Sequence, residues 1–346
     1  MTNPQKSTQL PVCYHPTLVV LVDDDTAFLE SAAFQLSTFQ PVVTFDDVHK
    51  AAAWLKNWFA NEQKSAPPLR VSHDDLTFSL ERRTVQLEVD HIFRQIHDIR
   101  RFLQPAVVIV DYEMPQMDGL TFCESLRDLP CKTILLTGTA TELVAVRGFN
   151  EGLIDRYVRK GSDGSLPTLE ADLAQLQKEY FIEQTYTMYD LLRRHSYAFL
   201  SDPAVARAVE GIMQQYQLVE YYLYPNPSGL LMLARDGKAH LMVIETEAGL
   251  LTHVEAAEAY DAPEALIQGL QNLELVPFFW PGAGMYTPAC VEWIDYCVKA
   301  TPIEGKETYY YGLFEMPKHL LPQNITNHFS FIRAFDSDPD QMLGLR

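Results

Sequence analysis

Short apolar runs separated by amphipathic segments dominate the first half of the chain. Runs of this length, bounded by turn residues, are typical of buried parallel strands. Amphipathic segments between them predict helices on both faces of the sheet. The pattern therefore favours an α/β fold, a doubly wound parallel five-stranded domain. Its expected strands are Leu18–Val22, Val42–Phe45, Ala106–Val110, Thr133–Leu136 and Tyr157–Arg159, and its expected helices are Ala27–Thr38, Val48–Phe59 and Leu166–Tyr180.

A long interval between Phe59 and Ala106 interrupts this alternation. Its first part, Asn61–Asp75, contains Pro67 and Pro68 and is typical of a linker. Its second part predicts a helix with an a/d heptad seam, giving a helical insertion over 61–104. Such a seam either drives homodimerisation or packs against its own domain, and the sequence leaves both alternatives open. The seam residues, at spacings of 4, 3, 4, 3 and 4, are Val85, Val89, Ile92, Ile96, Ile99 and Leu103.

The pattern changes after Leu191. Strand-like runs joined by turn residues, at Tyr221–Tyr224, Leu230–Ala234 and His240–Ile244, predict an antiparallel meander. Two helical stretches and two further strands follow. The second half is therefore expected to form an α+β domain with an antiparallel sheet. The later elements are expected at Leu250–Ala259, Pro263–Asn272, Val276–Trp280 and Thr308–Phe314.

The length of the chain fits two domains, because domains typically hold about 100–200 residues. The 346 residues are 47% hydrophobic, which is enough for two sizeable cores. The expected organisation is an N-terminal extension at 1–16, the first domain at 17–165, a linker helix at 166–189, the second domain at 190–336 and a tail at 337–346.

Charge argues against nucleic acid as a partner. The net charge is −19, and residues 186–346 carry 10 Lys and Arg against 20 Asp and Glu, a difference of −10. Since duplex DNA binding draws its affinity mostly from basic side chains, we expect no DNA binding by the second domain. No run of eighteen apolar residues predicts a membrane span, and the first residues lack the apolar core of a signal peptide. Five cysteines without a C-x-x-C pair fit a reducing, cytoplasmic location.

Polar side chains follow the predicted strands at their carboxyl ends. Asp23, Asp24 and Asp25 come after the first strand, and Asp111 heads the string Asp-Tyr-Glu-Met-Pro-Gln-Met-Asp-Gly-Leu after the third. Thr137 and Lys160 follow the fourth and fifth. In open α/β sheets ligands bind at this edge, so we expect a functional site here.

These residues and their spacing resemble the receiver domain of bacterial two-component response regulators, over residues 17–60 and 105–165. The resemblance implies that Asp111 is the phosphoacceptor and that Thr137, Lys160 and Tyr157 contact the phosphoryl group or switch with it. It also implies Mg²⁺ held by Asp23, Asp24, Asp111 and the main-chain carbonyl of Glu113. Mg²⁺ prefers such oxygen ligands, and a phosphoryl group added to this acidic cluster needs a compensating cation. The implied partner is a cognate sensor histidine kinase or phosphotransfer protein.

Two features depart from the simplest form of this interpretation. Receivers usually carry a cis proline after the lysine, whereas Gly161 follows Lys160 here, so the geometry of that loop is left open. Asp25 is more typical of a helix N-cap than of a metal ligand.

The whole chain is similar to the Legionella-type quorum-sensing response regulators. The likeness rests on a receiver followed by an aromatic-rich α+β domain, and on the segments Glu-Tyr-Tyr-Leu-Tyr-Pro and Pro-Phe-Phe-Trp-Pro. It implies phosphorylation by sensor kinases for a small diffusible signal, and an output domain of nucleotide-binding-like shape but undefined activity. Our leading interpretation is a phosphorylation-switched, non-DNA-binding output domain that binds a partner or a small ligand. The alternative is a phosphorylation-regulated enzyme with its active site in the output domain. A His/acid pair in a deep pocket would favour the enzyme, and a shallow apolar patch would favour partner binding.

Overall fold

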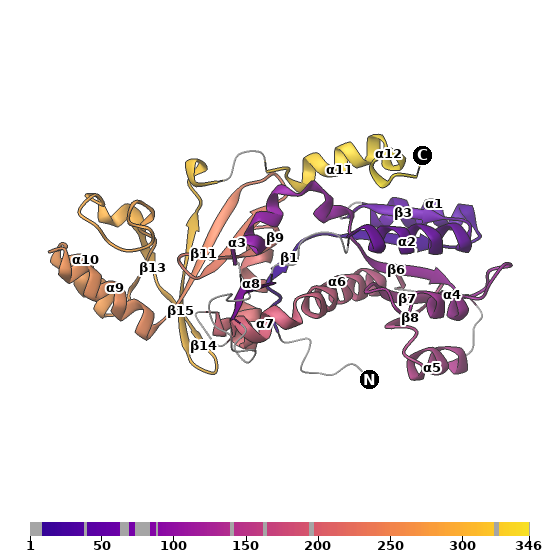
Figure 1. Ribbon diagram of the computed structural model, residues 1–346, viewed down its shortest axis with the longest axis horizontal. Helices are drawn as coiled ribbons and strands as arrows, with labels where there is room; N and C mark the ends of the chain where they lie inside the picture. The colour runs from indigo at the N-terminus through magenta and orange to yellow at the C-terminus, as the bar shows by residue number, and fades with distance from the viewer. Residues whose placement is uncertain are drawn as a thin grey trace.

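We analysed a computed structural model of the chain. Its two main sheets lie side by side along the long axis of the molecule, a parallel sheet at one end and an antiparallel sheet beyond it (Figure 1). The structure describes residues 9–37, 40–62, 69–72, 84–87, 89–138, 142–161, 165–193, 197–321 and 325–345.

The parallel sheet has five strands in the order β3-β2-β6-β7-β8, so β2 and β6 lie at its centre beside each other. Apolar strand residues alternate between the two faces, as the pleat requires. Val19 and Leu21 pack with α1 and α6 in one core, whereas Val20 and Val22 pack with α2 and α4 in another. The prediction of a doubly wound α/β domain is therefore confirmed. The elements are β2 (Leu18–Val22), α1 (Thr26–Leu36), β3 (Val42–Phe45), α2 (Val48–Glu62), β6 (Pro105–Asp111), α4 (Gly119–Ser125), β7 (Lys132–Thr137), α5 (Glu142–Asn150), β8 (Arg156–Arg159) and α6 (Ser165–Gln184).

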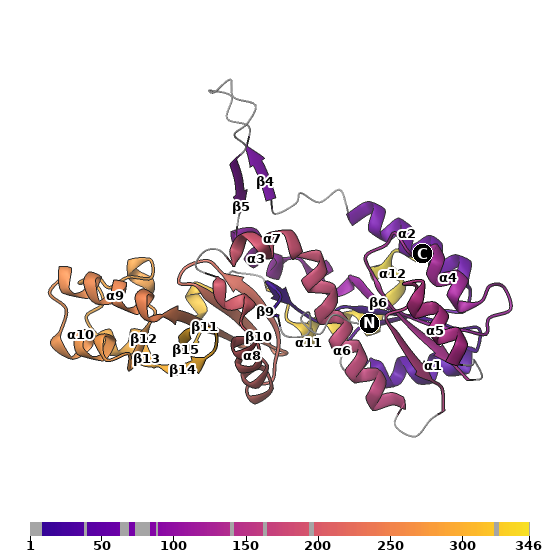
Figure 2. The same ribbon diagram turned by 90° about the horizontal axis from the view of Figure 1, so that it is seen from below.

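The second domain is built on a six-stranded antiparallel sheet in the order β1-β9-β10-β11-β15-β14. The predicted meander corresponds to β9, β10 and β11, which pair in sequence. Helices α9 and α10 with β12 and β13 form the end of the molecule farthest from the parallel sheet (Figure 2). The elements are α7 (Tyr186–Leu192), α8 (Pro203–Gln215), β9 (Leu218–Tyr224), β10 (Gly229–Ala234), β11 (Ala239–Thr246), α9 (Glu247–Ala259), α10 (Glu264–Gln271), β12 (Leu275–Pro277), β13 (Cys297–Lys299), β14 (Thr301–Glu304) and β15 (Thr308–Glu315).

The N-terminal segment belongs to the second domain. Strand β1 (Cys13–Tyr14) pairs antiparallel with β9, with Tyr14 opposite Tyr221. Leu10 and Val12 are fully buried in the core that also holds the sheet residues. The expectation of an N-terminal extension outside the two domains is therefore wrong for residues 9–16. The short strand escaped the sequence pattern because its partner lies about two hundred residues away.

The insertion is not one long helix. Strands β4 (Leu69–Ser72) and β5 (Thr84–Leu87) form a hairpin that projects from the body of the molecule (Figure 2), followed by α3 (Val89–Arg94) and two 3₁₀ turns, η2 (Gln95–His97) and η3 (Ile99–Leu103). Val85 thus lies in a strand, and Val89 is half-buried. Ile92 and Ile96 are fully buried in the core shared with β9, Leu103 is buried against the parallel sheet, and Ile99 is 37% exposed. The prediction that this seam faces a second copy of the chain is therefore wrong for its central residues. Ile92 and Ile96 are already covered by other residues of the same chain.

Replacing both Ile92 and Ile96 with aspartate is expected to unfold much of the protein rather than to release a folded monomer. Each change removes ~1.5–3 kcal/mol of apolar burial. Each also places an unpartnered carboxyl group in the core, at a further ~2–7 kcal/mol. Together these losses rival the ~5–15 kcal/mol of stability of a typical protein. Circular dichroism and sedimentation measure the outcome, with the more exposed Ile99→Asp as the variant that should stay folded. A folded double variant would contradict the observed packing.

The C-terminal segment returns to the parallel sheet. Helices α11 (His328–Ser337) and α12 (Pro339–Leu343) lie beside the first domain (Figure 1). Phe331 and Phe335 are buried in its core, and the Phe331 ring lies 4.9 Å from that of Phe102. Trp54 on α2 donates from Nε1 to the carbonyl of Leu343 at 3.2 Å. The expected tail at 337–346 is therefore part of the first domain's packing over its described residues.

A buried ion pair joins the two domains. Arg101 in η3 donates from Nε to Glu220 Oε2 on β9 at 3.0 Å, and its NH2 donates to the carbonyl of Thr326 at 2.8 Å. Tyr222 donates its hydroxyl to the same Glu220 oxygen at 2.7 Å. Both charged side chains are at most 2% exposed. The insertion, the second sheet and the C-terminal segment thus meet at one charged junction.

Two histidines lie beside this junction in the aromatic core. The His15 and His328 rings both pack edge-on against Phe102. Burial lowers the pKa of His15 to about 3 and that of His328 to about 4. Both rings are therefore neutral at physiological pH and behave as parts of the apolar core.

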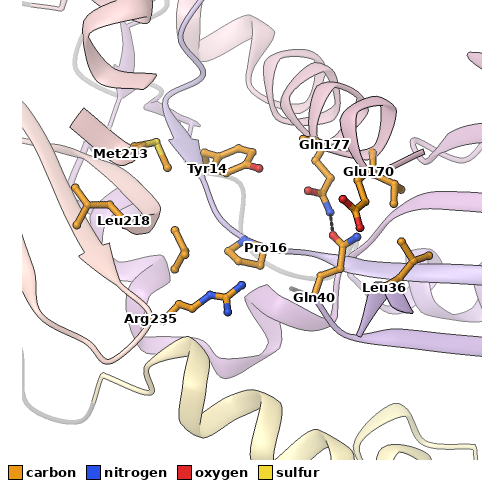
Figure 3. Close-up of a pocket in the computed structure, with 12 residues that line it drawn as sticks. Tyr14, Pro16, Leu36, Gln40, Glu170, Gln177, Met213, Leu218 and Arg235 are labelled. Carbon is orange, nitrogen blue, oxygen red and sulfur yellow. Dashed lines mark hydrogen bonds between the residues drawn. The ribbon is translucent and has the colours of Figure 1, made fainter. Parts of the chain in front are cut away.

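A cavity of about 380 Å³ also lies between the domains. Figure 3 shows Tyr14, Met213 and Arg235 of the second domain facing Leu36 and Gln177 of the first across it. The amide of Gln177 donates to Gln40 and to Thr17 at the wall formed by the first domain.

None of the helices in the described part of the chain combines the length and the apolar character that a membrane span requires.

Candidate functional site

The predicted site residues meet at the carboxyl edge of the parallel sheet. Val22 lies opposite Val110 in the register of β2 and β6, so Asp23 and Asp111 leave neighbouring strands side by side. Asp111 lies opposite Leu136 of β7, and Thr137 lies opposite Arg159 of β8. The residues that follow the strand ends therefore gather at the centre of the sheet, where ligands bind in open α/β folds.

Three carboxylates form the core of this site. Asp23, Asp24 and Asp111 each offer an oxygen, and these atoms all lie within 4.8 Å of one another. Asp23 and Asp111 are buried, whereas Asp24 is exposed at the rim. Desolvation raises the pKa of Asp23, and hydrogen bonds from Lys160 and from the Asp25 amide oppose that rise. The cluster thus holds closely spaced negative charge that needs a cation.

Lys160 is the cation that the protein itself supplies. Its Nζ lies 2.6 Å from Asp23 Oδ2 and 2.7 Å from Asp111 Oδ1. Desolvation opposes its charge, but the bonds to Asp111 and Asp23 outweigh that effect and raise its pKa. The ammonium also lies 4.3 Å from the centroid of the Phe28 ring, in cation–π geometry. Phe28 was not singled out in the sequence, because a phenylalanine in the first turn of a helix carries no chemical signal.

Backbone contacts fix the Asp111 carboxylate. The Glu113 amide donates to Asp111 Oδ2 at 2.9 Å, so each carboxylate oxygen of Asp111 has a different partner. Gly119 packs against the carbonyl of Asp111 so closely that a Cβ there would clash with it. Asp118 caps α4 by accepting from the Thr121 amide at 2.9 Å. The Asp-Gly pair of the sequence string therefore serves to bring α4 against the site.

The two departures noted in the sequence have local explanations. Gly161 adopts a positive φ of +72°, which glycine tolerates at low cost, so the loop after Lys160 turns by a left-handed residue. Asp25 accepts from the amides of Ala27 and Phe28 and is the N-cap of α1. The interpretation of Asp25 as a cap is confirmed.

Thr137 and Tyr157 lie on the two strands beside Asp111. Thr137 ends β7 and is fully buried, and its carbonyl accepts from the Lys160 amide at 2.8 Å. Tyr157 on β8 is half-buried against the core on the α2 and α4 face. Strands β7 and β8 lie on the same side of β6, so both residues lie on the side of Asp111 where Lys160 follows β8.

The donor set fits Mg²⁺. Carboxylate oxygens on a rigid sheet edge, with one carboxylate open to solvent, match a hard cation that keeps several waters. Asp23, Asp24 and Asp111 are the side chains that would hold it, with the Glu113 carbonyl as the further oxygen expected from the sequence.

Replacing Asp24 with alanine is expected to weaken Mg²⁺ binding about tenfold or more, because one of three carboxylate ligands is lost. The fold should persist, since relieving repulsion in a crowded anionic cluster costs no stability. Calorimetric titration measures the affinity. The matched control is Asp46→Ala, an exposed aspartate after the neighbouring strand β3 that is outside the cluster. Equal affinity of Asp24→Ala and wild type would place the metal elsewhere.

Comparisons with known proteins agree with this geometry. Residues 75–166 match the model of the response regulator receiver domain, a stretch that holds Asp111, Thr137 and Lys160 but not Asp23 or Asp24. The structure of the Legionella pneumophila response regulator LqsR is similar over 95% of this chain and 97% of that chain, with 28% identity and a TM-score of 0.76.

Separate receiver domains are more distant. The signal receiver domain of a putative Luxo repressor protein from Vibrio parahaemolyticus is 14% identical and covers 49% of this chain and 97% of its own, with a TM-score of 0.34. A CheY-like receiver domain protein from Methanospirillum hungatei is 17% identical and covers 47% and 96%, with a TM-score of 0.30. None of the curated proteins matches the chain significantly. The family match identifies a response regulator receiver domain in this chain, as the sequence predicted.

Proposed function

We propose that the protein is a response regulator that accepts a phosphoryl group on Asp111 and thereby switches its second, output domain. The donor is a cognate sensor histidine kinase or a phosphotransfer protein. One observation carries the proposal: Lys160 bridges Asp111 and Asp23 at the sheet edge, with Asp24 completing a carboxylate cluster of the kind that binds Mg²⁺.

The chemistry follows from this arrangement. A carboxylate oxygen of Asp111 forms a bond to phosphorus, while the bond from phosphorus to the donor nitrogen breaks and its electron pair stays with the donor. Phosphoryl transfer is loose, so the protein mainly positions groups and compensates charge. Mg²⁺ bound at the cluster supplies part of that compensation. Lys160 supplies a fixed ammonium, and Thr137 supplies a hydroxyl for the phosphoryl oxygens.

Helix α6 is the route from this site to the output domain. Arg156 on β8 pairs with Asp172 and Glu179 of α6, at 3.3 and 3.2 Å. Lys132 on β7 pairs with Glu183 near the end of α6 at 2.6 Å. Both cations lie on the strands that lead to the site, because β7 ends at Thr137 and β8 is followed directly by Lys160. A shift of these strands on phosphorylation therefore moves α6, whose buried residues share one core with the output sheet.

The output domain is proposed to bind a partner or a small ligand rather than DNA, because of its acidic excess. The alternative is an enzyme in this domain. A cavity of this domain is lined by His253 and Glu245, with Nε2 and Oε1 3.8 Å apart, and a His/acid pair in a pocket is the feature that the sequence analysis set as favouring this alternative. The proposed role in quorum sensing rests on the likeness to the Legionella-type regulators.

One experiment tests both phosphorylation of the first domain and its effect on the second. The full chain is incubated with acetyl phosphate and Mg²⁺, and amide hydrogen exchange is followed in α6 and β9. The proposal expects one added phosphate, detected by intact mass, together with changed exchange in both elements. Phosphorylation without any change in the output sheet would remove the switching part of the proposal. No phosphorylation at all would remove the receiver part.

A further inference from the structure

The output domain contains a cavity of about 500 Å³ that shares no residue with the Asp111 site. It lies where β11 ends and α9 begins, in the part of the molecule away from the parallel sheet (Figure 1). Its volume falls in the range of ~300–1,000 Å³ typical of small-molecule sites. Phe199, Ile244 and Met285 give it apolar walls, so a ligand with a short hydrocarbon part would find contacts there.

The carboxylates that line this cavity give it a negative charge. Glu245 and Glu307 both line it, and none of the described lining residues is a lysine or an arginine. The Glu245 side chain is only 16% exposed, whereas Glu307 lies at the exposed rim and accepts the hydroxyl of Tyr309 at 2.6 Å. A deep carboxylate and a rim carboxylate in one cavity favour a ligand with two positive charges.

A buried histidine provides an independent sign of a missing partner. His253 on α9 lines the cavity, and its side chain is 6% exposed. Its Nε2 faces Glu245, and its Nδ1 has no hydrogen-bond partner among the described residues. A buried polar atom without a partner is costly, so this wall of the cavity holds an unmet hydrogen-bond demand.

The helix terminus at this cavity is already satisfied by the protein. Thr246 caps α9 by accepting from the Gly249 amide at 3.1 Å. The Glu245 carboxylate fills the space that a side chain at Gly249 would occupy, so a negative charge lies against the first turn of the helix. The start of α9 therefore has its anion, and phosphate-like ligands would meet repulsion from Glu245.

We propose that this cavity binds a short aliphatic diamine. One ammonium group pairs with Glu245, the methylene chain lies along the apolar walls, and the second ammonium group pairs with Glu307. The inference deepens the proposed ligand-binding role of the output domain and does not depend on phosphorylation. The experiment therefore omits any phosphodonor, so a failure of the Asp111 chemistry would leave its result unchanged.

Calorimetric titration of the full chain with putrescine tests the inference. Wild type is compared with Glu245→Gln, with Glu307→Gln and with the control Glu247→Gln, an exposed residue of the same segment outside the cavity. Glu245→Gln should weaken binding about tenfold or more, because a charge-assisted hydrogen bond is lost. Glu307→Gln should weaken it less, since its partner charge lies at the rim, and the control should match wild type. Circular dichroism verifies the fold of each variant.

The net charge of −19 makes nonspecific attraction of polyamines the result to exclude. Equal affinity in all four proteins would overturn the site, as would the absence of putrescine binding by wild type. n-Butylamine, which has one charge, should bind at least about tenfold more weakly than putrescine. Equal binding of the two amines would overturn the diamine assignment. Because Glu307 is exposed, Glu307→Gln remains informative even if Glu245→Gln does not fold.

Discussion

Asp111→Asn is expected to abolish phosphorylation of the protein by a small phosphodonor. The amide has nearly the same shape as the carboxylate, but it lacks the nucleophilic anion that forms the acyl phosphate. Lys160 keeps its ion pair with Asp23 at 2.6 Å, so the site loses one bond and not its cation. Wild type should gain one phosphate in the presence of Mg²⁺, whereas the variant should gain none. Intact-protein mass spectrometry measures the difference.

The matched control is Asp118→Asn. Asp118 stands in the same sequence string and is exposed, and its structural task is to cap α4. Asparagine caps a helix about as well as aspartate, so this variant should fold and take up one phosphate like wild type. Undiminished labelling of Asp111→Asn would refute the assignment of the phosphoacceptor. Loss of labelling in both variants would point to damage around α4 instead.

Arg101→Ala is expected to destabilise the protein by roughly 3–5 kcal/mol, because it leaves the Glu220 charge buried without its ionic partner. Tyr222 still donates to Glu220, but a single hydroxyl does not replace a guanidinium that makes two bonds to the carboxylate. The carbonyl of Thr326 also loses its donor. Urea unfolding followed by circular dichroism measures the change in the free energy of unfolding.

Arg100→Ala is the control for this prediction. Arg100 is the adjacent residue and is exposed, with its guanidinium 5.6 Å from the Trp58 ring centroid. Its removal should cost about 1 kcal/mol or less. Combining Arg101→Ala with Glu220→Gln should recover part of the loss, since the buried charge is then gone. A stability within 1 kcal/mol of wild type for Arg101→Ala, on the order of an exposed pair, would show that the junction is hydrated.

The parallel sheet and its site were predictable because their signals are local. An apolar run identifies a buried strand, and the polar residue after it marks the sheet edge, as Asp23 and Asp111 illustrate. Strand bounds matched closely: Leu18–Val22 and Val42–Phe45 were predicted as observed. The helix-capping role of Asp25 was also readable, since it depends only on the residues that follow.

The failures share a physical cause, which is pairing between distant parts of the chain. The spacing of Ile92 and Ile96 shows that one face is buried but not what covers it, and the cover is β9 of the same chain. The short strand β1 has too few residues for a period-two pattern to appear. Helix α11 has a clear apolar face, yet nothing in its sequence indicates that Phe331 packs on Phe102.

Strand β1, near the start of the described chain, belongs to the sheet of the second domain, whereas helix α11, near its end, packs against the first domain. This arrangement affects the order in which the two domains can be completed during synthesis. During translation all strands of the receiver have been synthesised once Arg159 is in place, but the helix that covers Phe102 follows only from His328. Until then, the Phe102 side of the nascent receiver lacks the cover that Phe331 of α11 provides in the finished protein. By contrast, β1, the edge strand of the output sheet, is synthesised before the strands of that sheet with which it assembles. Cutting the protein between its domains should accordingly yield two incomplete folding units.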